Sequence, residues 1–209
     1  MSKTTALFPK IKNEVDFYKS IRAVIAEKRH VNYLQDVIQQ YEDYKQMFAG
    51  VFIPPNDHYN SVFRFRVDYL LKHPVWRVFE ILGCQSFNEL AMSIIDYMDW
   101  ANDHMHAFYL PEKTGKSISY EYTKYGIYAP QWEDDPFPTY KTDNVLIAHL
   151  DYQKYPKLGF VFDFGDGHRF NVSFQNIRAS KKQDSRETLP RLIDQRGVGP
   201  EQYPDFEEE

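Results

Sequence analysis

The chain has 209 residues and a formal net charge of −5, and its 26% charged and 43% hydrophobic residues are typical of a globular protein. This charge argues against broad, sequence-independent binding of nucleic acid, which depends on clustered Lys and Arg. A single cysteine, Cys84, excludes an intramolecular disulfide and a zinc site built on several thiolates. The sequence contains neither an apolar run of the ~20 residues that span a bilayer nor the apolar core of a signal peptide, so we expect a cytoplasmic protein.

The first part of the chain predicts two helices. Apolar residues recur at three- and four-residue steps over residues 13–28, as on one face of an amphipathic helix. Asn32 as N-cap and Gln35 as its N3 partner predict the start of a second helix, which ends at Gly50. A Pro-Pro step follows, so we expect residues 1–55 to form an antiparallel helical pair. Its apolar stripes then either dock on the main domain or form a dimer interface.

The next segment changes to the period of two that marks half-buried strands. Val62–Tyr69 alternates apolar and polar residues and predicts a strand, and Trp76–Leu82 predicts a second one. Ser86 and Glu89 have the spacing of a capping box, which opens a helix. Met105–Leu110 is short and apolar enough to form a third strand.

The last predicted elements surround an Asp-Gly turn. Residues 113–140 are Tyr-rich and irregular, and Val145–Leu150 is ambiguous between strand and helix. Alternating apolar residues on both sides of a Gly-Asp-Gly step predict a β-hairpin with one buried face. The alternating residues are Phe160, Phe162 and Phe164 before the turn and Phe170, Val172 and Phe174 after it. The final residues are polar and contain several prolines, which predicts a surface strap or tail.

Together these elements predict an α+β fold, in which one helix packs on an antiparallel sheet and an N-terminal helical hairpin precedes the sheet. A strand pair followed by a helix that crosses the sheet is also the way in which β-grasp-like folds begin. We expect three parts along the chain. They are the helical pair over residues 1–55, an α+β core domain over residues 56–182, and the C-terminal strap or tail over residues 183–209.

Four short motifs follow one another along the chain between Pro74 and Glu201. They are Pro74-Val75-Trp76-Arg77-Val78, the run Trp100–Phe108 with its His-x-His step, Asp163-Phe164-Gly165-Asp166-Gly167, and Pro190 with Gly197, Pro200 and Glu201. Together they resemble the Ri-plasmid open-reading-frame-three-like family over residues 62–204. The family has Trp directly after the hairpin turn and His two residues later, whereas His168 and Phe170 stand at these places here. The resemblance implies a protein of plasmids or other mobile elements, in a family of unknown function.

The strongest candidate site joins histidines and carboxylates from two of these motifs. Its members are Asp103, His104, His106, Asp163, Asp166 and His168. In a strand, His104 and His106 point to the same face, which is the spacing of a His-x-His metal pair. Together with Asp163 on a neighbouring turn, they predict a site for a divalent transition metal such as zinc, iron or manganese. Such a site could activate water for hydrolysis.

The same residues also fit a structural network. Phe108 shares the parity of His104 and His106, so both histidines could line a half-buried face. Asp163, close to an Asp-Gly step, is typical of a side chain that binds turn amides. A hydrogen-bonded network that holds the hairpin against the third strand would explain all six residues without catalysis. A small-ligand or peptide site made of the same groups is a third interpretation.

Aromatic residues are abundant, with 16 Tyr, 16 Phe and 3 Trp, and such rings build cores and also contact partners. Trp132, Phe137 and Tyr140 lie in an acidic, proline-containing loop that either recognises a protein partner or covers a sheet edge. We therefore expect a non-catalytic interaction or ligand-binding domain with a protein partner or a homodimer, and neither nucleic acid nor a membrane as partner. The alternative is a metal-dependent hydrolase that uses the His-x-His and Asp site.

Overall fold

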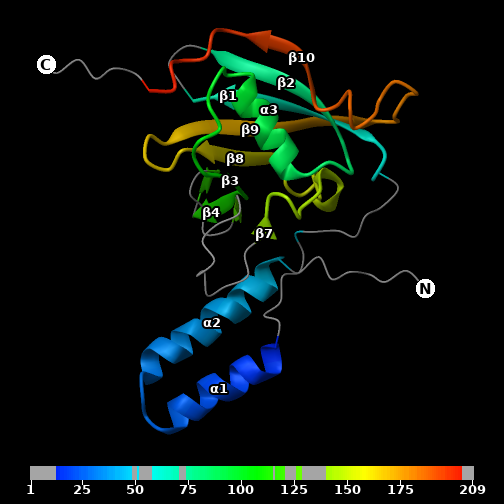
Figure 1. Cartoon of the computed structure of the whole chain (residues 1–209). Coiled ribbons are helices and arrows are strands. Elements are labelled where there is room, and N and C mark those ends of the chain that lie inside the picture. The colour runs from blue at the N-terminus through cyan, green and yellow to red at the C-terminus, as the bar shows by residue number, and fades with distance from the viewer. Residues whose placement is uncertain are drawn as a thin grey trace, which may run out of the picture.

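A computed structural model describes residues 13–48, 51, 58–70, 74–114, 116–120, 126–128 and 140–203. Two helices come first, and the remaining elements build a main sheet with one further helix (Figure 1) and a separate two-stranded sheet of residues 112–114 and 117–119. The helices are α1 (Glu14–Ala26), α2 (Val31–Phe48) and α3 (Phe87–Asp96), with a 3₁₀ turn at Ile147–His149. The strands are β1 (Val62–Tyr69), β2 (Val75–Leu82), β3 (His106–Tyr109), β4 (Glu112–Thr114), β5 (Ser117–Ser119), β6 (Gly126–Tyr128), β7 (Tyr140–Lys141), β8 (Lys157–Phe162), β9 (His168–Arg178) and β10 (Arg191–Arg196).

The main sheet has the strand order β10-β2-β1-β9-β8-β3-β6-β7. Every neighbouring pair from β10 to β6 is antiparallel, and β7 joins β6 in the parallel direction. Helix α3 packs on one face of this sheet (Figure 1). The predicted α+β fold, with a helix on an antiparallel sheet after a helical pair, is therefore confirmed. The strand–strand–helix start is present as β1, β2 and α3, and its likeness to a β-grasp fold stays a prediction.

The core lies between α3 and the sheet, and both sides follow from local sequence patterns. In β1 the alternation places Phe63 and Phe65 in the core, and each is 2% exposed or less. The helix starts with the predicted capping box, because Ser86 Oγ accepts from the amide of Glu89 at 3.2 Å while Glu89 Oε2 accepts from the amide of Ser86 at 2.7 Å. Its apolar face is fully buried, and burial of each large side chain contributes about 1.5–3 kcal/mol. This face consists of Phe87, Leu90, Ile94 and Ile95.

The predicted β-hairpin is confirmed as β8 and β9, with one correction. Phe160 and Phe162 are fully buried in the main core and Phe170 faces them, as the alternation predicts. Phe164, however, packs on a separate cluster with Ala107, Tyr109 and Val161. Its predicted place beside Phe160 and Phe162 is wrong, because β8 ends at Phe162 and Asp163 takes the left-handed φ of 53°, which breaks the alternation.

Three strands of the main sheet have no counterpart among the predicted elements: β6 and β7, which touch the segment over residues 113–140 that was predicted to be irregular, and β10. β10, which lies within the expected C-terminal strap, pairs antiparallel with β2 and forms an edge of the sheet. Gly197 follows it with φ 76°, and a Cβ atom there would come within 2.7 Å of the carbonyl oxygen of Pro74. Only glycine fits such a position without strain, so the strap turns there and returns across the domain.

The N-terminal helices form an antiparallel pair that lies below the sheet in Figure 1. Their facing ends are joined by Lys45, whose Nζ lies 2.8 Å from Glu14 Oε1 and 3.0 Å from Glu42 Oε1. α2 begins at Val31, so its N-cap position is His30, and the predicted N-cap Asn32 is two residues too late and lies inside the first turn. In the part of the chain that the structure describes, none of the helices is both long and apolar enough to cross a membrane.

Candidate functional site

The segment between α3 and β3 is held in place by the returning C-terminal strap. Trp100 Nε1 donates to the carbonyl of Pro200 at 2.8 Å. Gln202 binds both backbone groups of Ala101. Its Oε1 accepts from the amide of Ala101 at 2.6 Å, and its Nε2 donates to the carbonyl of Ala101 at 3.0 Å. The same Nε2 lies 3.0 Å from Asp103 Oδ1. The strap thus positions the start of the predicted Asp103–His106 cluster.

On the other side of the site, Asp163 organises the hairpin turn. Its Oδ1 accepts hydrogen bonds from the amides of Gly165 at 2.8 Å and Asp166 at 3.3 Å. Its carbonyl accepts from the amide of Gly167 at 2.6 Å. The prediction that this carboxylate binds turn amides is therefore confirmed. Only 5% of Asp163 is exposed, whereas Asp166 is exposed on the turn.

The second carboxylate oxygen of Asp163 faces His104. His104 Nε2 lies 3.4 Å from Asp163 Oδ2 and 3.9 Å from Asp103 Oδ1, and 43% of the imidazole is exposed. Asp103 also accepts a hydrogen bond from the hydroxyl of Tyr203 at 2.8 Å. This bond, with smaller contributions from the other neighbours, keeps the pKa of Asp103 below its usual range. Two carboxylates and one accessible imidazole thus come together.

His106 points to a different environment. β3 begins at His106, so His104 lies before the strand and the premise that both histidines share one strand is wrong. His106 is 3% exposed, its Nε2 lies 3.3 Å from Thr142 Oγ1, and its ring packs near Phe160. Burial lowers its pKa to about 4, so the imidazole is neutral near pH 7.

His168 belongs to a third environment, at the start of β9, where it directly follows the turn and pairs with Phe162. Its Nδ1 lies 2.9 Å from the hydroxyl of Tyr69, and its Nε2 lies 3.1 Å from the carbonyl of Gln202. Its ring centroid is 4.2 Å from that of Trp100. Both nitrogens therefore have partners, and the ring connects the sheet to the C-terminal strap.

The six predicted residues thus separate into groups. His104, Asp103 and Asp163 lie together, and His106 lines the same cleft while its Nε2 contacts Thr142. His168 lies apart from this cleft, between Tyr69 and Gln202, and Asp166 is exposed on the turn. Among the described residues, no three His, Cys, Asp or Glu side chains form a group that could hold a metal ion.

An open cleft of about 660 Å³ lies beside His104. Its lining combines polar and apolar side chains from α3, the segment before β3 and the hairpin turn. These residues are Asn88, Met92, Asn102, Asp103, His104, Met105, His106, Asp163, Phe164 and Gly165. The carboxylates and the imidazole can hydrogen-bond a ligand, and the Met and Phe side chains can cover its apolar part.

Several residues of this site could not be identified from the sequence. Tyr203 and Gln202 reach Asp103 from about one hundred residues away, and Thr142 reaches His106 from a separate loop. The only sequence feature that pointed to Gln202 and Tyr203 was the Pro200-Glu201 part of the C-terminal motif, which directly precedes Gln202.

Most of the predicted partner-binding residues lie outside the residues that the structure describes. Trp132 and Phe137 lie outside the described residues. Tyr140 begins β7, where its backbone pairs with that of Ile127, and its side chain lies outside the description.

Comparisons with known proteins agree with the fold. The family model described as plasmid pRiA4b ORF-3-like protein matches residues 61–203. A crystal structure of a protein of unknown function from Methanosarcina mazei Go1 is similar with a TM-score of 0.53 and 16% sequence identity, over 67% of this chain and 71% of that one. No curated protein matches this chain. Because the family model spans most of the sequence, the chain belongs to the plasmid pRiA4b ORF-3-like family, whose function is unknown.

Proposed function

We propose that this chain is a non-catalytic interaction protein that acts as a homodimer joined through the α1–α2 pair. The observation that carries this proposal is the incompletely covered apolar face of α1, since none of the residues of this helix is buried. Its apolar stripe is only half-buried although the helix is paired with α2. This stripe consists of Phe17, Ile21, Val24 and Ile25. A stable amphipathic helix normally buries such a face, so a further surface is needed to cover it.

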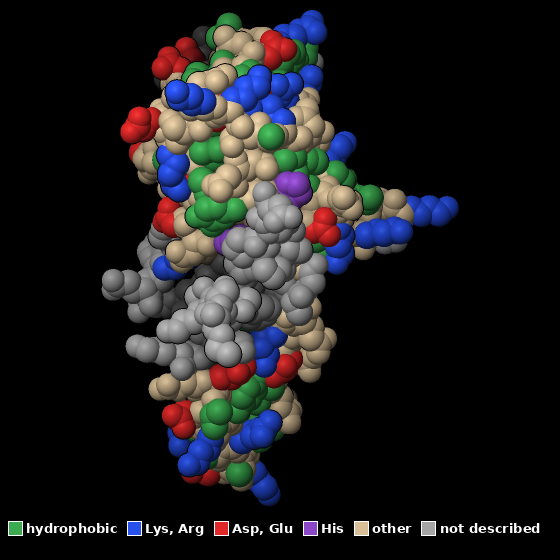
Figure 2. Space-filling view, turned by 90° about the vertical axis from the view of Figure 1, so that its right-hand side faces the viewer, with side chains coloured by type: hydrophobic (Ala, Val, Ile, Leu, Met, Phe, Trp, Pro, Cys, Tyr) green, Lys and Arg blue, Asp and Glu red, His purple; other side chains and the backbone are tan. Residues whose placement is uncertain are grey.

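The stripe continues into a groove between the two helices. The groove has a volume of about 360 Å³ and its lining is mainly apolar. It is lined by Ser20, Ile21, Val24, His30, Tyr33 and Leu34. The exposed fraction is 69% for Tyr33 at its edge and 81% for Val15 at the far end of α1. Figure 2 shows hydrophobic side chains at the surface of this lower part of the molecule. Tyr is a residue type that often dominates protein interfaces when it becomes covered.

A second copy of the chain fits this surface better than a strongly charged partner. Six acidic and five basic side chains in residues 14–48 leave a net charge of −1, so two pairs would not repel each other strongly. Two antiparallel helix pairs related by a two-fold axis can pack as a four-helix bundle, which buries the stripes of both copies.

Light scattering of the full chain after size exclusion tests the proposal. We expect a mass twice that of the 24.9 kDa chain. Tyr33→Asp should shift the mass toward that of the monomer, whereas Gln35→Asp on the exposed face of α2 should leave the dimer intact. Circular dichroism would verify that both variants keep the helices. A monomeric wild-type protein at every concentration would rule out the homodimer.

The alternative function, a metal-dependent hydrolase, is supported by one observation. His104 lies close to Asp163 and Asp103 at an open cleft, so an accessible imidazole stands beside two carboxylates, although these described residues do not form a three-ligand metal group. Metal analysis of the purified protein tests this alternative, as argued in the Discussion.

A further inference from the structure

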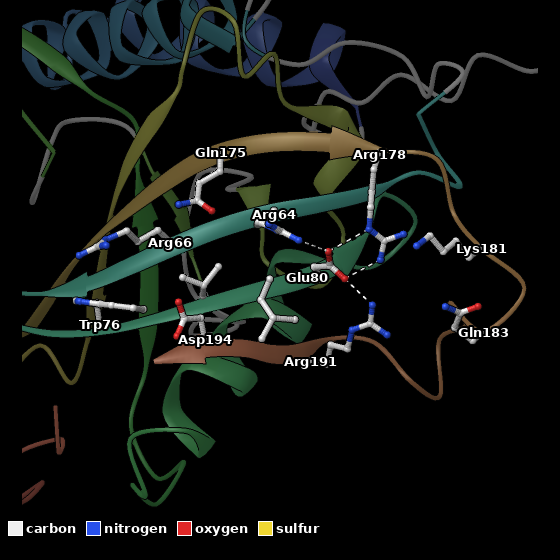
Figure 3. A pocket seen from close by; sticks show the side chains of 12 residues that line it. Arg64, Arg66, Trp76, Glu80, Gln175, Arg178, Lys181, Gln183, Arg191 and Asp194 are labelled. Atoms are coloured by element: carbon white, nitrogen blue, oxygen red, sulfur yellow. Dashed lines mark hydrogen bonds and ion pairs between the residues drawn. The ribbon is translucent and has the colours of Figure 1, made fainter. Parts of the chain in front are cut away.

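A second groove lies on the face of the sheet opposite α3, over strands β10, β2, β1 and β9. It has a volume of about 640 Å³. Figure 3 shows cationic side chains from three strands and from the β9–β10 loop around it. These are Arg64, Arg66, Arg178, Lys181 and Arg191. They face away from the core because in β1 the arginines alternate with the buried Phe63 and Phe65.

The groove is organised by one buried carboxylate. Glu80 is 3% exposed and accepts hydrogen bonds from three guanidinium groups, as the dashed lines in Figure 3 show. The nitrogen–oxygen distances are 2.9 Å from Arg64, 2.6 Å from Arg178 and 2.5 Å from Arg191. Three cations are thus gathered around one anion, and the arrangement is rigid because the partners come from β1, β2, β9 and β10.

Much of the donor capacity of these cations is unused. Arg178 is saturated, since Glu80, Asp184 and the carbonyl of Ala179 accept from all of its nitrogens. Arg64 binds Glu80 through Nη2 alone, and its buried Nε has no hydrogen-bond partner among the residues that the structure describes. Such a buried donor without a partner costs free energy. Nη1 of Arg64 also makes no hydrogen bond to the described residues, so it is a donor that an added acceptor can use.

Two further cations have donors to spare. Within the described ranges Arg191 uses only Nη2, which contacts Glu80 and Asp184. The ammonium group of Lys181 makes no ion pair within the described part of the chain, and only its backbone amide is bonded, to Asp184. Free donors of Arg64, Arg191 and Lys181 therefore lie around one end of the groove.

The two ends of the groove differ in charge. At one end, Arg66 binds Asp68 and its guanidinium lies over the Trp76 ring at 4.5 Å, and Asp194 adds a further carboxylate. At the other end, the carboxylates of Glu80 and Asp184 are both buried beneath the cations. A long polyanion would meet the acidic end, so the groove suits a small anion held at the cationic end.

We propose that this cationic end of the groove, made by Arg64, Arg191 and Lys181, binds a small phosphate-bearing ligand. Guanidinium forks match phosphate oxygens, and each charge-assisted hydrogen bond is stronger than a neutral one. A phosphate group offers several acceptor oxygens at once, which three converging donor groups can share. The site is separate from the α1–α2 surface, so it neither requires nor excludes dimer formation.

Calorimetric titration of the full chain with inorganic pyrophosphate tests this proposal. We expect saturable binding to the wild-type protein and a loss of about tenfold in affinity for Arg64→Gln and for Lys181→Gln. Arg29→Gln is the matched control, because Arg29 is 67% exposed in the connection between α1 and α2 and should keep the wild-type affinity. Lys181 is exposed and lies outside the helices and strands, so its substitution should not disturb the fold. Thermal unfolding would verify this point for both groove variants.

The binding affinities of ATP and of inorganic triphosphate show whether the phosphate group belongs to a nucleotide or to an inorganic phosphate. Equal affinities would show that the phosphate groups alone are recognised, and tighter binding of ATP would show that the ligand is a nucleotide. Both results support the proposal. It is overturned if pyrophosphate gives no binding heat, if Arg64→Gln and Lys181→Gln bind like the wild type, or if Arg29→Gln weakens binding as much as they do.

Discussion

His104 and Asp163 meet at the open cleft, with the imidazole Nε2 3.4 Å from the carboxylate Oδ2. The other oxygen of the same carboxylate accepts hydrogen bonds from the amides of Gly165 and Asp166. One half of the Asp163 side chain therefore holds the turn, while the other half contacts the only accessible histidine of the predicted cluster in the described structure.

Substitutions of Asp163 should separate these two roles. Asp163→Ala removes both turn hydrogen bonds, at about 1 kcal/mol each, and places Ala at φ 53°, where it fits less well than Asp or Asn. We expect a loss of about 2–4 kcal/mol in the free energy of unfolding. Asp163→Asn keeps the Oδ1 acceptor and tolerates the same φ, so it should lose less than about 1 kcal/mol. Urea unfolding measures both values, and equal losses would contradict this account of the turn.

The two neighbouring histidines should respond differently to removal. His104→Ala changes a side chain that is 43% exposed, so the free energy of unfolding should fall by less than about 1 kcal/mol. His106→Ala leaves a cavity beside Phe160 and removes the contact with Thr142, and should lose about 2–4 kcal/mol. Parallel urea titrations compare the two variants. A larger loss for His104→Ala would mean that the exposed imidazole is the structural one.

Patterns within a few residues allowed most of the fold to be predicted. β1 has the predicted bounds Val62–Tyr69, because alternation and burial agree from Phe63 to Asp68, over most of the strand. The Ser86–Glu89 capping box is likewise a contact between near neighbours. Phe164 was misplaced for the opposite reason. The left-handed conformation of Asp163 changes the face of the residue that follows it, and alternation alone does not reveal it.

Contacts between distant residues explain what the sequence did not predict. β10 pairs with β2 across more than one hundred residues, and its own sequence is too polar to indicate a strand. The buried Glu80 is equally hidden, because its partners Arg178 and Arg191 are 98 and 111 residues away. The candidate site was predicted as one group because the His-x-His spacing assumes a continuous strand, whereas β3 starts only at His106.

Metal analysis should decide between a binding protein and a metal-dependent hydrolase. The described residues hold no group of three metal ligands, so we expect protein purified without tag or chelator to contain no stoichiometric transition metal. Addition of zinc or manganese should also leave the melting temperature unchanged. One metal ion per chain that disappears in His104→Ala would instead favour the hydrolase, and would justify a screen of phosphoester and peptide substrates.

Removal of the Glu80 charge should destabilise the sheet. Hydrogen bonds from Arg178, followed by those from Arg64 and Arg191, outweigh the effect of burial and lower the pKa of Glu80 to about 2. Glu80→Gln leaves three guanidinium groups around a neutral side chain. Because these groups are 25% to 37% exposed, we expect a loss of about 2–4 kcal/mol, below that of a fully buried network.

Asp68→Asn is the matched control for Glu80→Gln, since it removes a carboxylate that is 34% exposed on the same face. It should lose less than about 1 kcal/mol, as is usual for surface ion pairs. Urea unfolding of both variants measures the difference. Similar losses would show that the buried position of Glu80 adds nothing to the network.

The buried His106 should make the protein less stable in mild acid. Its pKa is about 4 in the folded state and near 6.5 in the unfolded state, so the unfolded chain binds more protons between these values. The free energy of unfolding should therefore fall by about 2–3 kcal/mol from this residue as the pH drops from 7 to 4.5. His106→Gln does not titrate and should lack this part of the decrease. His149, whose pKa burial also lowers, is present in both proteins, and folded Glu80 takes up a proton only below this pH range. Urea titrations at the two pH values measure the difference, and equal pH dependence in both proteins would show that His106 does not stay neutral when folded.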